Sequence, residues 1–181
     1  MINTMPSIRR VLTGEDAVGR SIFIEDGPSP AVRLVPQRPG YRVTNIWRTG
    51  PAPDAVDAPD SINVHQGVLP PEGGTVLRVI DYPPEPRDPV ELKRMQDATF
   101  AQLYPDAQHE LKSGDHPGMH CTDTVDYALV LVGEITAILE EEETVLHAGD
   151  ILIQRGTNHA WANRSGNPAR IAFILIDGKR K

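Results

Sequence analysis

The sequence predicts an all-β fold, a barrel or jelly roll of short strands, and two observations support this prediction. The chain has 17 prolines and 15 glycines among 181 residues, a composition typical of many short strands joined by turns. Strand-like runs separated by turn residues fill the carboxy-terminal half. Cys121 is the only cysteine, which excludes an internal disulfide framework, so packing must stabilise the fold.

Composition and charge limit what the protein can be. Hydrophobic residues make up 39% and charged residues 24% of the chain, which is typical of one globular domain spanning residues 1–181. No apolar run approaches the roughly 20 residues that cross a bilayer. Residues 1–10 lack the apolar stretch of a secretory signal, so we expect a cytoplasmic protein with no membrane partner. The net charge of −7 would repel a phosphate backbone and argues against nucleic acid.

Residues 1–74 are predicted to form a strand-rich amino-terminal extension of that single domain. Short apolar runs broken by turn residues predict strands in this part of the chain and at its junction with the next, at residues 21–25, 41–48, 61–68 and 75–82. Residues 50–60 carry three prolines and three aspartates among small residues. Such a segment buries little apolar area, so it predicts an exposed loop.

Residues 88–104 predict a short inserted helix. Val90, Leu92, Met95, Phe100 and Leu103 lie among charged and glutamine residues without glycine, directly after a cluster of prolines. Pro105 ends the pattern. Because the helix belongs to no regular series of strands, we expect it to be an insertion that covers the mouth of a pocket.

Residues 75–177 are predicted to form the barrel around this insertion. After His120 the strand-like runs follow one another regularly, at residues 125–140, 144–147, 150–154, 159–163 and 170–176. Turn residues separate them at Gly133, Gly149 and Gly156, at residues 140–143 and at residues 165–168. This spacing is typical of a barrel or jelly roll. We find no internal repeat, so a second copy of the same domain is not expected.

The segment from Gly149 to Asn163 resembles the second conserved motif of the cupin superfamily. It reads Gly-Asp-Ile-Leu-Ile-Gln-Arg-Gly-Thr-Asn-His-Ala-Trp-Ala-Asn, where the family has a Gly-Asp turn, a strand, a Pro-x-Gly turn and then His-x-x-x-Asn. Gln154 stands where proline is usual. The resemblance implies a double-stranded β-helix, the cupin form of the jelly roll.

The first cupin motif aligns with His120-Cys121-Thr122, Asp126 and Gly133. Thr122 takes the place of the second histidine of the family and Asp126 the place of its glutamate. The wider sequence resembles an uncharacterised bacterial branch of single-domain cupins. Since cupins commonly pair through exposed strands, the resemblance implies a homodimer.

The chemistry that these residues suggest is a metal centre built from His120, Asp126 and His159. Two imidazoles and one carboxylate can hold a divalent iron, manganese, nickel or zinc ion and leave positions open for water or substrate. We expect catalytic roles for Asp126 and His159, acting on a small organic molecule in the barrel as an oxygenase, lyase or isomerase. Side chains predicted to contact the substrate are Thr122, Tyr127, Arg155 and Trp161. His116 offers a replacement for the missing second histidine.

Two alternatives use the same residues. Without a metal, His120, His159 and Asp126 can act as acid and base in a dehydratase or isomerase. Alternatively, the barrel has lost part of its metal site and serves as a non-catalytic module that binds or senses a small ligand. Trp161 also fits a core position and Asn163 a turn position. Isolated histidines, which we expect at the surface or at strand edges, are His65, His109 and His147.

Overall fold

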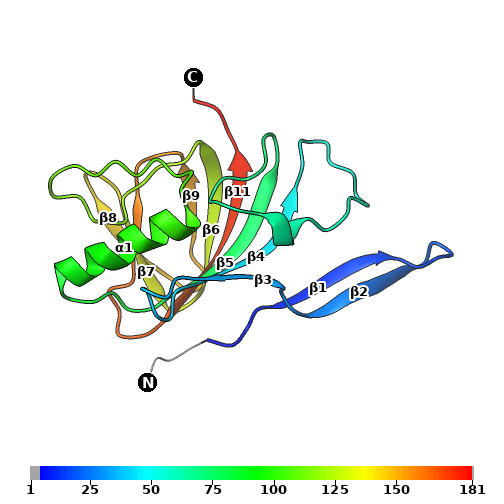
Figure 1. Ribbon diagram of the computed structural model, residues 1–181, viewed down its shortest axis with the longest axis horizontal. Coiled ribbons are helices and arrows are strands. Elements are labelled where there is room, and N and C mark those ends of the chain that lie inside the picture. Colours follow the sequence, from blue (N-terminus) through cyan, green and yellow to red (C-terminus); the bar gives the residue numbers. More distant parts are fainter. Residues whose placement is uncertain (1–4, 181) are drawn as a thin grey trace.

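The computed structural model describes residues 5–180 and shows a mostly β protein with one α-helix (Figure 1), which confirms the predicted all-β class. Its elements, in chain order, are β1 (Arg9–Glu15), β2 (Ser21–Pro28), β3 (Ala31–Leu34), β4 (Arg42–Thr49), a 3₁₀ turn (Ile62–Val64), β5 (Thr75–Tyr82), α1 (Pro89–Leu103), β6 (Thr124–Val132), β7 (Glu134–Ile138), β8 (Glu143–His147), β9 (Ile151–Arg155), β10 (Ala160–Ala162) and β11 (Ala169–Asp177).

Two antiparallel sheets form the barrel. The larger has the strand order β3-β4-β5-β11-β6-β9 and the smaller has the order β10-β7-β8. Since side chains alternate along a strand, each sheet turns one apolar row inward, and the core between the sheets includes Val76, Ile80, Val130, Ile135, Ala137, Ile171 and Phe173. The strands β3 and β4, which come from the segment predicted as an extension, belong to the large sheet, because β4 pairs with β5.

Gly133 divides the run predicted at residues 125–140 into β6 and β7. Its φ of +74° lies in the left-handed region, and an added Cβ would lie 2.8 Å from the carbonyl oxygen of Pro168. Only glycine satisfies both conditions without strain. At this turn the chain passes from the large sheet, which contains β6, to the small sheet, which contains β7.

The helix α1 confirms the insertion predicted at residues 88–104. The carboxylate of Asp88 caps it by accepting a hydrogen bond of 2.9 Å from the backbone N–H of Val90, and Pro89 occupies the first helical position, where its missing N–H costs nothing. Its buried residues Gln96, Thr99 and Phe100 lie on one face. This face turns toward the space between the sheets.

The strand predicted at residues 61–68 is wrong, because this segment is a 3₁₀ turn followed by a loop. Ile62, His65 and Val68 are buried, and their spacing of three residues fits a tight helical turn rather than a strand. The Asp60 carboxylate also accepts a hydrogen bond of 2.9 Å from the N–H of Ile62. The burial of His65 contradicts the surface position that we expected for it.

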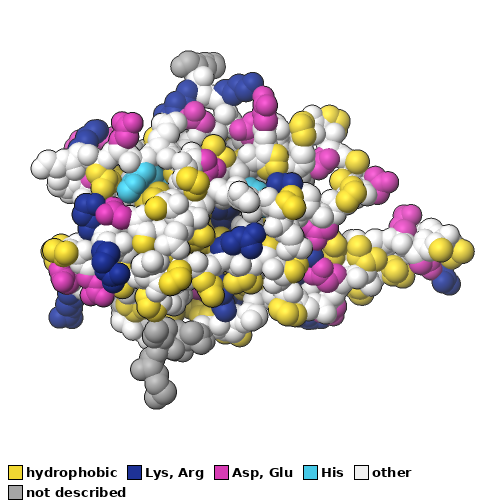
Figure 2. All heavy atoms as spheres, viewed as in Figure 1, with side chains coloured by type: hydrophobic (Ala, Val, Ile, Leu, Met, Phe, Trp, Pro, Cys, Tyr) yellow, Lys and Arg dark blue, Asp and Glu magenta, His cyan; other side chains and the backbone are white. Residues whose placement is uncertain are grey.

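The strands β1 and β3 were not predicted from the sequence. The strands β1 and β2 form a two-stranded arm that projects from the barrel (Figure 1). Hydrophobic side chains lie along this arm in Figure 2, and Phe23 and Ile24 are 73% and 55% exposed. In β1 the buried position at the base of the arm is Arg10, and Val11 is 43% exposed, so this strand lacks the apolar alternation expected of a half-buried strand. Within residues 5–180, no helix is long and apolar enough to cross a membrane.

Candidate functional site

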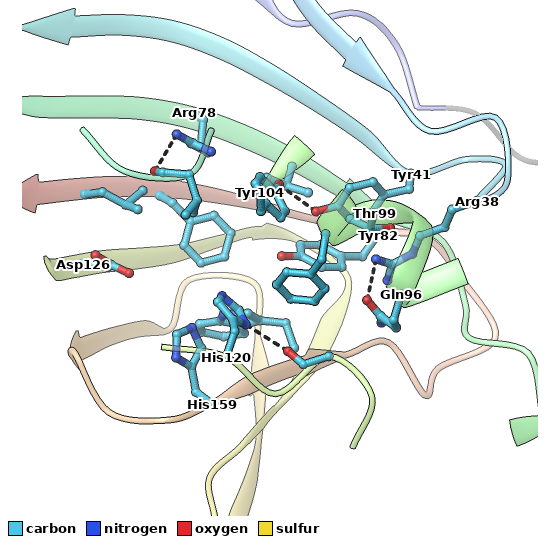
Figure 3. Close-up of a pocket in the computed structure, with 17 residues that line it drawn as sticks. Arg38, Tyr41, Arg78, Tyr82, Gln96, Thr99, Tyr104, His120, Asp126 and His159 are labelled. Atoms are coloured by element: carbon cyan, nitrogen blue, oxygen red, sulfur yellow. Dashed lines mark hydrogen bonds between the residues drawn. The ribbon is translucent and has the colours of Figure 1, made fainter. Parts of the chain in front are cut away.

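A pocket lies between the two sheets, beneath α1 (Figure 3). The strand β5 contributes Arg78 and Tyr82, β6 contributes Asp126, and α1 contributes Gln96, Thr99 and Phe100. His120 and His159 come from the segments that precede β6 and β10. The helix therefore covers the pocket, as the sequence predicts, and the pocket contains the three residues of the predicted centre.

His120 and His159 form a pair that the backbone holds together. Each donates its backbone N–H to the carbonyl of the other at 2.9 Å, and their ring centroids are 4.4 Å apart. The Nδ1 atoms lie 2.9 Å from the carbonyl oxygens of Gly118 and Thr157 respectively. A carbonyl only accepts, so each Nδ1 carries the proton and each Nε2 keeps its lone pair.

Burial keeps both imidazoles neutral near neutral pH. It lowers the pKa of His120 to about 4. The pKa of His159 falls to about 3, mainly through burial and further through the neighbouring His120. Neutral imidazoles with available Nε2 lone pairs can accept hydrogen bonds or bind a metal.

Asp126 brings a carboxylate into the same pocket. It lies on the inward face of β6 with 5% of its surface exposed, and its buried Oδ1 has no hydrogen-bond partner among the residues that the structure describes. Burial raises the pKa of Asp126 to about 6, although a hydrogen bond from Thr124 opposes the shift. This carboxyl group therefore changes its charge close to neutral pH.

The three predicted metal ligands share the pocket but do not converge on one point. Within residues 5–180, no three His, Cys, Asp or Glu side chains are grouped closely enough to hold one ion. The two imidazoles lie together, and Asp126 stands apart from them in Figure 3. The side chains in this arrangement do not fit the three-ligand centre.

His116 does not complete the set. Its Nε2 faces the Glu85 carboxylate at 3.3 Å, and its Nδ1 accepts the backbone N–H of Gly118 at 3.1 Å. The pocket lining does not include it. The turn at Pro117 and Gly118 directs this histidine toward Glu85 rather than toward His120.

The predicted substrate contacts separate into two groups. Trp161 lines the pocket, with its ring centroid 5.9 Å from that of His159. Thr122 is buried beside Thr124, with 2.8 Å between their hydroxyl oxygens, but does not line the pocket. Tyr127 and Arg155 are exposed, because strand alternation turns the odd-numbered residues of β6 and β9 to the outer face. The structure therefore does not bring Tyr127 or Arg155 to the pocket.

Sequence reasoning missed two buried arginines in the pocket wall, Arg38 and Arg78. Arg78 donates to the carbonyl oxygens of Gly67 and Val68 at 3.3 and 2.9 Å, and its Nη2 lies 3.0 Å from Nε2 of His65. Burial, and the nearby Arg78 charge, lower the pKa of His65 to about 4. A single arginine among the apolar residues of β5 was the available indication of Arg78. The turn that contains Arg38 offers no comparable pattern.

Comparison with known proteins identifies several similarities. Residues 107–176 match the family described as "Cupin domain". The chain is 30% identical over 179 residues to the phomopsin biosynthesis cluster protein D of Diaporthe leptostromiformis, which covers 94% of this chain and 78% of that protein. It is 26% identical over 176 residues to the cupin-domain-containing oxidoreductase fogC of Aspergillus ruber, covering 93% and 71% of the two chains.

Among solved structures, a Cupin 2 conserved barrel domain protein from Salinispora arenicola matches with a TM-score of 0.41 and 13% identity, covering 80% of this chain and 82% of that one. The two curated relatives described above are fungal proteins. The bacterial branch expected from the sequence is therefore not supported.

Proposed function

The chain belongs to the cupin superfamily, and from that premise we propose that it is an enzyme acting on a small organic molecule in the pocket of Figure 3. The observation that carries this proposal is the position of Asp126, a buried carboxyl group with an unpartnered Oδ1, in the same pocket as two neutral imidazoles. Relatives named as cupin-domain-containing oxidoreductases also support an enzymatic role.

Asp126 is the proposed proton-transfer group. A general base works best when its pKa lies near the working pH, and burial raises the pKa of Asp126 to about 6. Its ionised form would remove a proton from a carbon or hydroxyl of the substrate and, once protonated, return it at another atom. Isomerisation and dehydration both require such a transfer.

The proposed role of His120 and His159 is to orient the substrate. Because each Nδ1 is engaged by a backbone carbonyl, the neutral rings can only accept hydrogen bonds through Nε2. A substrate hydroxyl or N–H group meets this requirement. The aromatic wall formed by Phe100, Trp161 and Phe173 excludes water from the reacting atoms.

Proton exchange tests this proposal across several classes of candidate substrate. The protein would be incubated in D₂O with a panel of small aromatic and aliphatic carbonyl compounds, and loss of C–H signals would be followed by NMR. We expect exchange with at least one compound class, abolished by Asp126→Asn and unchanged by Asp57→Asn, which alters an exposed loop carboxylate. Exchange that survives Asp126→Asn would contradict the role of Asp126, and a panel with no turnover would favour the ligand-binding alternative.

Dependence on a divalent metal is the second candidate. Two adjacent imidazoles with available Nε2 lone pairs favour it, since imidazole is the commonest metal-binding side chain. Elemental analysis of the purified protein tests this candidate, with His159→Ala as the variant and His147→Ala as the control at an exposed histidine. Metal content that is unchanged in His159→Ala would rule out a metal held by this pair.

We also propose a homodimer. The outer face of β6 and β9 exposes large hydrophobic side chains, namely Val125, Tyr127, Leu131, Ile151 and Ile153. The β1–β2 arm exposes Phe23 and Ile24, and a two-stranded hairpin by itself is only marginally stable in water. In a two-fold pair each arm would cover the sheet face of the other copy, so one chain supplies both complementary surfaces.

A further inference from the structure

We propose that Arg38 forms an anion subsite at one side of the pocket and that the ligand is a planar, unsaturated or aromatic carboxylate whose carboxylate group binds this guanidinium. Such a ligand would be the substrate of the enzyme proposed above. Its role as a substrate rests on that proposed function, whereas its binding at Arg38 does not. Binding of a carboxylate at Arg38 can be tested whether or not catalysis occurs.

Arg38 is buried without a carboxylate partner. Only 4% of its surface is exposed, yet no Asp or Glu within residues 5–180 lies within ion-pair distance of it. Two other buried arginines differ in this respect, because Arg10 pairs with Glu25 and Asp60 and Arg170 pairs with Asp81. An unpaired buried charge costs several kcal/mol, so this arrangement suits a partner that arrives with the ligand.

Arg38 also retains most of its hydrogen-bonding capacity. A guanidinium has five N–H donors and stays charged at every pH that a protein tolerates. In the described part of the chain, the side chain of Arg38 makes one hydrogen bond, from Nη1 to Oε1 of Gln96 at 3.1 Å. Its remaining donors match the two oxygens of a carboxylate, the ligand that guanidinium binds in a two-point geometry.

Neighbouring groups hold the guanidinium of Arg38 in position. It lies 4.1 Å from the centroid of the Tyr41 ring, a cation–π contact that leaves its edge available. Gln96 accepts from Arg38 and donates from Nε2 to Glu85 at 3.4 Å. Glu85 thus reaches Arg38 only through the amide of Gln96, while its other oxygen faces His116 at 3.3 Å.

The charge and shape of the lining define the rest of the ligand. The lining contains two arginines, Arg38 and Arg78, and one acidic residue, Asp126, so its balance of charged side chains favours an anion. In Figure 3 Arg38 and Asp126 lie at opposite sides, with Tyr41, Tyr82 and Tyr104 between them. A carboxylate on Arg38 therefore directs a planar apolar body along aromatic walls toward Asp126 and the imidazole pair.

Binding of sodium benzoate and of benzamide tests this subsite. The two probes have the same shape and differ in charge. We expect calorimetry on the full chain to show benzoate binding about ten- to a hundredfold more tightly than benzamide, the value of one charge-assisted pair. This preference should fall to within about twofold in Arg38→Met and remain intact in Arg155→Met, which changes an exposed arginine.

Several outcomes would overturn the subsite. These are equal binding of the two probes, failure of both to bind, or a preference for benzoate that persists in Arg38→Met. If Arg38→Met does not fold, Arg38→Lys provides the measurement, because lysine keeps the charge but loses the two-point geometry and should weaken benzoate binding severalfold. Asp126→Asn should lose proton exchange and keep the preference for benzoate, so failure of the proposed reaction and failure of the subsite give different results.

Discussion

His120 and His159 face each other across an isolated antiparallel bridge in which their backbones exchange two hydrogen bonds of 2.9 Å. The bridge places both side chains on one face, and carbonyl oxygens of the adjoining turns fix both Nδ1 protons. Two residues separated by 39 positions in the sequence thus become one unit with paired acceptor atoms. Both imidazoles are neutral near neutral pH, and this affects the free energy of unfolding as well as ligand binding.

Acid should destabilise the protein already below about pH 6, because three buried histidines are neutral in the folded state. The pKa values of His65, His120 and His159 lie at about 4, 4 and 3 in the folded state, below about 6.5 in the unfolded chain. Between these pH values the unfolded chain therefore binds up to three more protons at these histidines. The folded state binds one more proton at Asp126, whose pKa is raised, and this offsets one of the three histidine protons. The free energy of unfolding should fall by about 3 kcal/mol per pH unit between pH 6 and 4.

Urea denaturation at a series of pH values measures this slope. His159→Gln should reduce the slope by about one proton, or ~1.4 kcal/mol per pH unit, while His147→Gln, at an exposed histidine, should leave it unchanged. A slope close to zero in the wild-type protein over this range would show that the three imidazoles are not buried in their neutral form.

Asp126→Asn should stabilise the protein above pH 6 even as it removes proton transfer. The folded-state pKa of about 6 exceeds the ordinary aspartate value of 3.8, so the folded state disfavours the ionised carboxylate. Replacing it by a neutral amide should raise the free energy of unfolding by about 1 to 3 kcal/mol at pH 8. The gain should vanish below pH 4, where the Asp126 carboxyl of the wild-type protein is protonated in both the folded and the unfolded state.

Chemical denaturation at pH 8 and pH 3.5 provides the comparison. The exposed Asp57→Asn serves as the control at both values. A loss of stability in Asp126→Asn at pH 8 would mean that the carboxylate has a favourable partner in the folded state, and the assignment of its raised pKa to burial would then be incorrect.

The barrel was predictable because its residues carry local patterns, whereas the pocket depends on contacts between distant segments. Gly149 to Asn163 and the helix at residues 88–104 combine turn, cap and periodicity features within a short stretch. Arg38 reaches the site through packing against Tyr41 and Gln96, which no local pattern encodes. Likewise, the motif alignment grouped Asp126 with His120 and His159, but it did not predict the separation of Asp126 from the imidazole pair.

Gly67→Ala should destabilise the loop that borders the pocket. Gly67 has φ +75°, and an added Cβ would lie 2.3 Å from the Asp106 carboxylate, which accepts the N–H groups of Val68 and Leu69 at 2.8 and 2.9 Å. The substitution therefore combines backbone strain with displacement of this carboxylate. We expect a loss of about 2 to 4 kcal/mol.

Gly19→Ala separates the two effects. Gly19 has φ +78° and no atom within 4 Å of the added Cβ, so only the backbone strain of about 1 kcal/mol should appear. Thermal unfolding of both variants gives the difference. Equal losses would show that Asp106 moves away freely, and that its hydrogen bonds contribute little to holding the loop against Arg78.

Dimerisation through the arm should depend on Phe23, which is 73% exposed in the single chain. In a two-fold pair each substitution removes two contacts, so Phe23→Ser should weaken the dimer by about a hundredfold or more, from the burial of two aromatic side chains. Ile153→Ser, on the outer face of β9, should act in the same direction. Val56→Ser is the control, because Val56 is fully exposed on the loop of residues 50–60. Sedimentation equilibrium measures all four proteins, and a monomeric wild type, or a Phe23→Ser dimer as tight as that of Val56→Ser, would contradict the arm exchange.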